Sequence, residues 1–136
     1  MKKNVCESLR LGQAIRAKQQ MCYENAIKVI RHVPGYKHAF YVEGIVVEGK
    51  DSVFEHGWVE RHGEILDPTL PLDKMAYFPG LRIEGKKGID QAFRQPEPIT
   101  GVVLPLFHRF VGDCEMQRAW ERAIAFATSS PVLPGF

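Results

Sequence analysis

The stretch FEHGWVERHGEILDPT, residues 54–69, contains two segments with the composition of β-strands on either side of His62-Gly63. A two-residue turn at this pair predicts a hairpin in which Trp58 lies opposite Asp67. Side chains alternate between the two faces of a strand, and directly opposed residues share a face. His56 and Asp67 are therefore expected on one face, one diagonal step apart. A slip of one residue would place them on opposite faces, so the length of the turn decides whether they can meet.

Apolar residues at helical spacing occur both before and after this hairpin. Asn4 is expected to cap the first helix, with Glu7 three residues later as in a capping box. Pro34-Gly35 ends the second helix, and Asp113 is the expected cap of the last one. The stripe expected to bury that last helix is Met116, Trp120, Ala123 and Ala127. The predicted helices are 5–18, 22–32, 87–93 and 114–127.

β-branched and aromatic residues predict the strands of a meander. The turn 48–51 separates the first strand from the second, and residues 71–80 are expected to form loop and edge structure. The predicted strands are 39–47, 53–60, 64–67 and a short one at 81–83. Helices followed by antiparallel strands indicate a single α+β domain over residues 1–136. In it the N-terminal helices pack on an antiparallel sheet, and a C-terminal helix follows.

The composition excludes several classes of protein. The chain is 45% hydrophobic and 25% charged, which is ordinary for a globular domain. A net charge of +2 is too small to indicate a nucleic-acid partner, and no run reaches the roughly 18 apolar residues of a membrane span. No apolar leader follows Lys2 and Lys3, and the three cysteines are an odd number. These features predict reduced thiols in a cytoplasmic protein.

Two of the cysteines lie at the expected starts of helices. Cys22 opens the second helix and Cys114 opens the last one, whereas Cys6 falls inside the first helix. A helix N-terminus stabilises negative charge and so favours the reactive thiolate. Position alone leaves Cys22 and Cys114 as candidate nucleophiles. The alternative for each is a structural role as a small buried hydrophobic side chain, which is the more common case for a single cysteine.

Three motifs in series carry a family resemblance. Cys22 lies in CYENA, His56 in EHGWVE and Asp67 in ILDPT, with YVEG at residues 41–44 between the first two. A cysteine that opens a helix, then His-x-Trp on a strand, then Asp-Pro-Thr at the end of the next strand resembles the transglutaminase-like branch of the papain-like cysteine proteases. The resemblance covers about residues 19–70, and it extends to small bacterial and phage proteins with these motifs.

The resemblance implies a papain-like core and a catalytic triad. Cys22 would be the nucleophile, His56 would hold it as a thiolate and later give up a proton, and Asp67 would orient the imidazole. The backbone N–H of Cys22 and one side-chain donor would hold the oxyanion. Papain-like peptidases place a Gln six residues before the cysteine, where this chain has Arg16. Gln20 and Gln19 are the alternative donors, and each is equally well explained as a solvent-facing amide.

Three further residues are expected to support the site. Trp58 is expected to pack beside it, and Asn25 is expected to bond to backbone near the start of the second helix. Glu43 lies in a strand that should be central to the sheet, so its carboxylate needs a partner unless it faces solvent. Cysteine, histidine and aspartate can also bind zinc, but the chain has no close-spaced ligand pair such as C-x-x-C. No metal or other cofactor is expected.

The expected function is acyl chemistry by a cysteine nucleophile. The substrate would be an amide or ester in a peptide, a protein or a small molecule, and hydrolysis by a peptidase, amidase or deamidase is the leading expectation. Transfer to an amine is the first alternative, because a triad does not select the acyl acceptor. A papain-like binding module without turnover is the second. The oligomeric state and the role of the tail from residue 129 are not indicated by the sequence.

Overall fold

The computed structural model describes residues 1–93, 105–106 and 114–129. Within these ranges the strands are β1 (Lys2–Lys3), β2 (Phe40–Glu48), β3 (Ser52–Arg61), β4 (Glu64–Leu66) and β5 (Met75–Glu84). The helices are α1 (Val5–Ile15), α2 (Cys22–His32), α3 (Gly85–Ala92) and α4 (Cys114–Ser129). The strands form one sheet in the order β1-β4-β3-β2-β5. The predicted α+β class is confirmed.

The hairpin of β3 and β4 has the predicted register. Val59 pairs with Leu66 and Arg61 pairs with Glu64, so only His62 and Gly63 form the turn. Both turn residues have positive φ, 52° and 73°, which matches the right-handed twist of the flanking strands. The two-residue turn on which the alignment of the hairpin depends is therefore present.

The sheet departs from the prediction at both of its edges. It is mixed rather than purely antiparallel, because β1 pairs in parallel with β4. Loop and edge structure was predicted at 71–80 and a short strand at 81–83; residues 71–74 are loop and 81–83 are strand, but the edge strand begins earlier than 81, since β5 runs along β2 from Met75 to Glu84. Pro79 interrupts the usual strand composition, but β5 is an edge strand, where a missing N–H costs no ladder bond. A register shift at Gly80 absorbs the irregularity.

The first two helices begin where they were predicted. Asn4 caps α1 through its side-chain oxygen, which accepts the N–H of Glu7 at 2.9 Å. This helix ends at Ile15 rather than 18, because Arg16 adopts a left-handed conformation with φ 53° and its N–H bonds back to Gln13. The bounds of α2 are those predicted from its apolar spacing.

The later helices differ slightly from the prediction. The predicted helix 87–93 is α3, which begins two residues earlier, and α4 extends two residues further than 127. Asp113, its predicted cap, lies outside the described residues. Trp120 was wrongly placed in the buried stripe, because Ala119 and Ala123 are fully buried while Trp120 is 43% exposed. The small alanine side chains allow α4 to lie close to the sheet.

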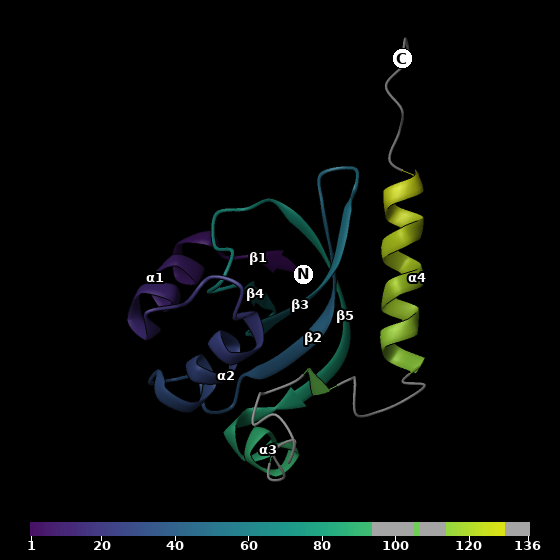
Figure 1. Ribbon diagram of the computed structural model, residues 1–136. Coiled ribbons are helices and arrows are strands. Elements are labelled where there is room, and N and C mark those ends of the chain that lie inside the picture. Colours follow the sequence, from purple (N-terminus) through teal and green to yellow (C-terminus); the bar gives the residue numbers. More distant parts are fainter. Residues whose placement is uncertain (94–104, 107–113, 130–136) are drawn as a thin grey trace.

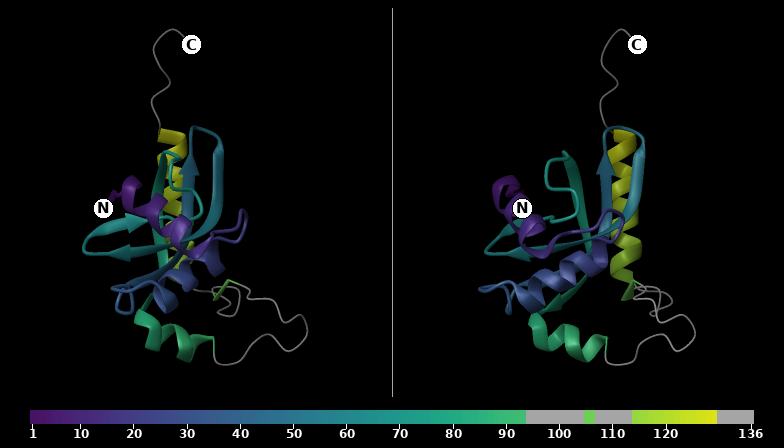
Figure 2. Two further views of the ribbon diagram at one scale, coloured as in Figure 1. Left: turned by 90° about the vertical axis from the view of Figure 1, so that its left-hand side faces the viewer. Right: turned by 60° about the vertical axis from the view of Figure 1, so that its left-hand side comes forward.

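Alternate residues of the sheet pack against the helices. Tyr41 and Val59 belong to the cluster that buries the inner sides of α1 and α2, including Leu11. Further along β2, Ile45 packs with Met116 of α4. Figure 1 shows α1 and α2 together at one end of the sheet, with α4 standing along β2 and β5. In the views of Figure 2 the tip of the β2–β3 hairpin lies beside the end of α4.

The opposite face of the sheet carries a smaller cluster. It contains Val42, Val46, Trp58 and Ile65, with Tyr77 of β5 packed against it. Alternation along β3 places His56 on this same face. Within the described ranges, every helix is too short or too polar to span a bilayer.

The start of α2 packs against β3 beside His56. The last pair between β3 and β4 is Val59 with Leu66, so the pairing with β4 stops before it reaches His56. Tyr23, in the first turn of α2, lies over Gly57, where an added Cβ would be 2.6 Å from the tyrosine ring. Glycine at this position lets the helix approach the strand closely, which brings Cys22 to the level of His56.

Substitution of Gly57 by alanine is expected to push the start of α2 away from β3. We expect a loss of about 1–3 kcal/mol in the free energy of unfolding, because the added methyl overpacks a close contact. Urea denaturation measures this loss. The control is Gly49→Ala at the hairpin tip, where nothing lies within 4 Å and only the positive φ of 64° is strained. Equal losses for both variants would contradict a specific close contact at Gly57.

Candidate functional site

His56 and Asp67 meet in the interior of the protein. Nε2 of His56 lies 2.8 Å from Oδ2 of Asp67, and the two residues are 3% and 0% exposed. The predicted hairpin register is present, and it brings these two side chains together on one face, as expected. Asp67 follows β4 directly, and Pro68 has no N–H that could continue the ladder.

Asp67 is held by four donors. Oδ1 accepts the backbone N–H groups of Thr69 and Leu70 at 3.1 and 3.0 Å. Oδ2 accepts the Tyr77 hydroxyl at 2.7 Å in addition to His56. Burial by itself raises the pKa of Asp67, but the hydrogen bonds, led by the one with His56, outweigh burial and lower it. Asp67 is therefore ionised at neutral pH although it is buried.

The side chain of Cys22 acts on the same imidazole. Burial by itself lowers the pKa of His56, but the hydrogen bond with Asp67 and the neighbouring Cys22 side chain raise it to about 9. Asp67 occupies Nε2, so Nδ1 is the ring nitrogen left for the sulfur. His56 therefore stands between a carboxylate and a thiol, and it is protonated at neutral pH.

Cys22 reaches this position as the first residue of α2. Met21, the N-cap residue, makes no side-chain capping bond, so the first N–H groups of the helix are not covered by a cap. The positive end of the helix dipole therefore lies at Cys22. The other two cysteines, Cys6 and Cys114, are exposed on different helices, whereas Cys22 is half-buried.

Tyr77 is the site residue that sequence reasoning missed. It lies on β5, in the region predicted to be loop and edge structure, and its hydroxyl donates to the same Asp67 oxygen that His56 contacts. Burial, followed by the nearby charge of Asp67, raises the pKa of Tyr77, so the hydroxyl keeps its proton. In the sequence, the signal for this strand is the alternate spacing of Met75 and Tyr77. Pro79 continues that spacing, but a proline argues against a strand, so the signal was missed.

Asn25 has the structural role that was predicted for it. Its side-chain amide donates to the backbone oxygen of Lys18 at 2.8 Å and to the Thr69 hydroxyl at 2.9 Å. The Asn25 side-chain oxygen also accepts the Lys18 N–H at 3.2 Å. This one side chain therefore joins the loop before Cys22 to the turn that holds Asp67.

Gln19 and Gln20 lie in that loop, and both are exposed. Gln20 has a positive φ of 64°, which bends the chain just before Cys22. Gln19 lines a hollow of about 250 Å³ between the end of α1 and residues 68–71. Among the described residues, no hydrogen bond joins either amide to Cys22, His56 or Asp67. Their oxyanion role remains a prediction, and Arg16 is likewise exposed.

Trp58 and Glu43 are both fully buried. The Trp58 ring stacks on His56 with centroids 6.2 Å apart, and its Nε1 donates to Glu60 at 3.1 Å. Glu43 accepts the Tyr41 hydroxyl at 2.5 Å and the Leu106 N–H at 2.7 Å. The expected partner of Glu43 is thus found, and this carboxylate links β2 to the short described segment at residues 105–106.

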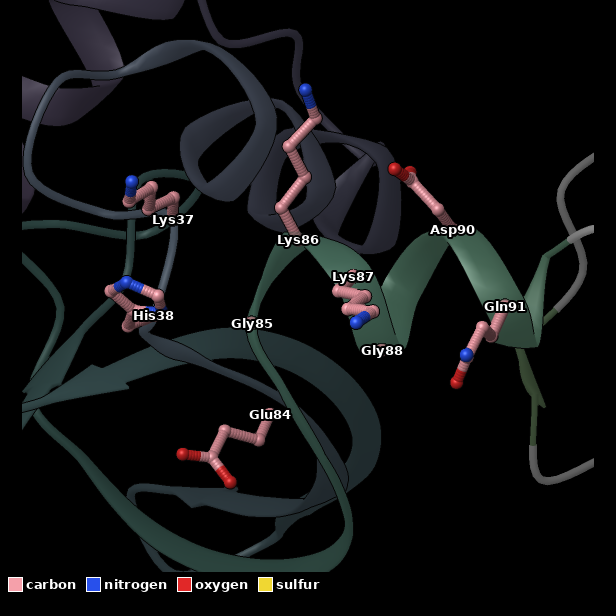
Figure 3. Close-up of a pocket in the computed structure, with 9 residues that line it drawn as sticks. All are labelled: Lys37, His38, Glu84, Gly85, Lys86, Lys87, Gly88, Asp90 and Gln91. Atoms are coloured by element: carbon pink, nitrogen blue, oxygen red, sulfur yellow. The ribbon is translucent and has the colours of Figure 1, made fainter.

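A larger cavity lies elsewhere, at the start of α3. It measures about 760 Å³ and is lined by Lys37, His38, Glu84, Gly85, Lys86, Lys87, Gly88, Asp90 and Gln91. Figure 3 shows that its side chains do not converge, since Lys86 and Asp90 point to one side while Glu84 and Gln91 point to the other. The N–H groups of Gly85 and Lys86 already donate to backbone oxygens at 2.8 Å. Neither Cys22 nor His56 lines this cavity, so this larger cavity is separate from the candidate catalytic residues.

The described residues contain no group of three or more His, Cys, Asp or Glu arranged to hold a metal ion. Comparison of the chain with models of known families found no match. Comparison with curated proteins and with solved structures found none either. Interpretation of the site therefore depends on its own geometry and on the motifs that carry it.

The His56–Asp67 pair is expected to make the stability of the fold depend on pH. The pKa of His56 is about 9 in the folded protein and about 6.5 in an unfolded chain. Its contribution is therefore complete below about pH 6.5 and is lost as the pH rises through about 9. We expect the free energy of unfolding to fall between about pH 6 and pH 10 by up to about 3 kcal/mol more in the wild type than in His56→Gln.

Urea denaturation at a series of pH values measures this difference. The control is His38→Gln, which removes an exposed histidine in the turn before β2. Parallel pH curves for the wild type and His56→Gln would contradict the raised pKa of His56.

Proposed function

We propose that the chain catalyses acyl transfer from an amide or ester through a thioester on Cys22, with hydrolysis as the overall reaction. The observation that supports this most directly is that the buried imidazole of His56 is bonded to Asp67 at 2.8 Å, while the Cys22 side chain is near enough to raise its pKa. The α+β fold, with the cysteine opening a helix and the histidine on a central strand, is compatible with a papain-like, transglutaminase-like core.

The first half of the reaction forms the acyl-enzyme. With a pKa of about 9, His56 is an imidazolium at neutral pH and pairs with the Cys22 thiolate. The sulfur attacks the carbonyl carbon, and the carbonyl π electrons move to the oxygen. As the tetrahedral intermediate collapses, His56 gives its Nδ1 proton to the departing amine or alkoxide. The products of this half are a thioester on Cys22 and a neutral imidazole.

The second half returns the enzyme to its starting state. His56, now neutral, takes a proton from water, and the hydroxide oxygen attacks the thioester carbon. Collapse of this intermediate breaks the C–S bond and releases a carboxylic acid, which leaves the thiolate and the imidazolium in place. Asp67 keeps its charge throughout and holds the imidazole by Nε2.

The start of α2 is suited to the oxyanion. The backbone N–H of Cys22 is at the positive end of the helix, and the N-cap residue Met21 offers no competing side-chain bond. A donor from a side chain, for which Gln20 and Gln19 are the candidates, would complete the hole. An amine in place of water would give transfer, and a groove that holds a peptide without turnover would give binding alone.

Selective alkylation tests the thiolate. At about pH 6 an ordinary thiol is less than about 1% ionised, so iodoacetamide is expected to label Cys22 at least about tenfold faster than Cys6 or Cys114. Peptide mapping by mass spectrometry measures the three rates in one sample. His56→Ala is expected to slow the labelling of Cys22 to the rate of the other two, while His38→Ala leaves it unchanged. Equal slow labelling of all three cysteines would contradict the proposal.

Trapping of the acyl-enzyme tests the reaction itself. A panel of activated esters and acyl amides is expected to add one acyl group to Cys22, and none in Cys22→Ser. Release of free acid indicates hydrolysis, and a product formed only with an added amine indicates transfer. The turnover rate should fall above about pH 9, where His56 loses its proton. Rapid alkylation of Cys22 without any turnover across the panel would favour the binding module.

A further inference from the structure

Tyr77 and His56 share one oxygen atom of Asp67. The tyrosine hydroxyl lies 2.7 Å from Oδ2 and His56 Nε2 lies 2.8 Å from the same atom. The other oxygen, Oδ1, is occupied by the backbone N–H groups of the turn that follows Asp67. A carboxylate has about four lone-pair sites, so this one has no further site to offer. Rotation of the carboxylate would break bonds on both oxygens.

The tyrosine is itself fixed from two sides. Its ring packs edge-on against Trp58, with centroids 5.0 Å apart. The ammonium of Lys3 lies 5.4 Å from the centre of the same ring and donates to the backbone oxygens of Leu70 and Asp73. Lys3 thus holds both Tyr77 and the turn whose N–H groups bind Asp67. These contacts hold the Tyr77 ring with its hydroxyl on Oδ2.

Two donors on one acceptor oxygen weaken one another. A phenol binds a carboxylate most strongly when no cation neutralises that carboxylate, so the Tyr77 bond is stronger when His56 is neutral than when it is protonated. We propose that Tyr77 is a positioning residue that competes with His56 for Oδ2 of Asp67 and so limits how tightly Asp67 holds the protonated imidazole. This inference rests on the proposed function for its consequence, because an imidazolium held less tightly gives its proton to a leaving group more readily.

The charged and titratable groups around the pair come from several elements. Cys22 faces His56 from α2, Tyr77 faces Asp67 from β5, and the charge of Lys3 reaches Asp67 from β1. Asp73, in the loop before β5, acts on both Lys3 and Tyr77. A comparison that changes only the Tyr77 hydroxyl leaves every other one of these groups in place.

The test is a titration of the His56 ring by NMR. The background carries Cys22→Ser, so that the thiol does not titrate in the same range, and His56→Gln identifies the signal. In this background Tyr77→Phe is expected to raise the pKa of His56 by roughly half a pH unit, a threefold change in the protonation constant. The control is Tyr36→Phe, which removes a hydroxyl bonded to Glu7 and not to Asp67. It is expected to leave the pKa of His56 unchanged.

Each other result would overturn the inference. An unchanged pKa in Tyr77→Phe would mean that the hydroxyl does not compete for Oδ2. A lowered pKa would mean that the hydroxyl is needed to hold Asp67 in place, which is the opposite role. If Tyr77→Phe does not fold, fluorotyrosine at position 77 provides the second measurement. Its more acidic hydroxyl is a stronger donor, so the pKa of His56 should then fall.

The NMR titration is independent of turnover. A raised pKa in Tyr77→Phe together with no acyl-enzyme would support the competition and contradict the proposed function. An acyl-enzyme together with an unchanged pKa of His56 in Tyr77→Phe would support the proposed function and contradict the competition. Where both hold, Tyr77→Phe is also expected to move the upper pH limit of turnover in the same direction as the pKa of His56.

Discussion

The buried carboxylate of Asp67 is the group on which the arrangement of the site depends. A charge with no exposed surface is tolerated only when its oxygens are fully bonded. Here the four donors come from three places: His56 on β3, Tyr77 on β5, and the backbone of the turn that starts at Thr69. Loss of any one donor leaves a charged oxygen less satisfied, so these segments hold one another in register. The same bonds that satisfy Asp67 also orient the imidazole.

The approach of α2 depends on a second constraint, which is steric. The pairing of β3 with β4 stops before it reaches His56, and Gly57 has no side chain to keep the helix away. The Asn25 side chain then ties the loop before Cys22 to Thr69, two residues beyond Asp67. Cys22 and Asp67 are therefore positioned by the same turn, although they approach His56 from different elements. This explains how a half-buried thiol and a fully buried carboxylate act on one ring.

Local patterns predicted much of the fold because their causes are local. The bounds of α2 follow from apolar spacing, and the cap of α1 at Asn4 follows from a residue whose side chain bonds only three positions away. The predictions that failed depend on distant partners. Pro79 obscured β5, which is a strand because it pairs with β2, and Trp120 was given a buried position that the smaller Ala119 occupies. The parallel pairing of β1 has no signal in a two-residue segment.

The sequence by itself determined that His56 and Asp67 could meet, because the face of a side chain in a hairpin follows from the length of its turn and from alternation along the strand. It also determined that a cysteine opens a helix. Only the tertiary structure decided that the cysteine at that helix start is beside His56, and that Tyr77 shares the carboxylate. Those contacts join segments far apart in the chain. One depends on close packing at Gly57 and the other on the edge strand β5, and no local sequence periodicity indicates either feature.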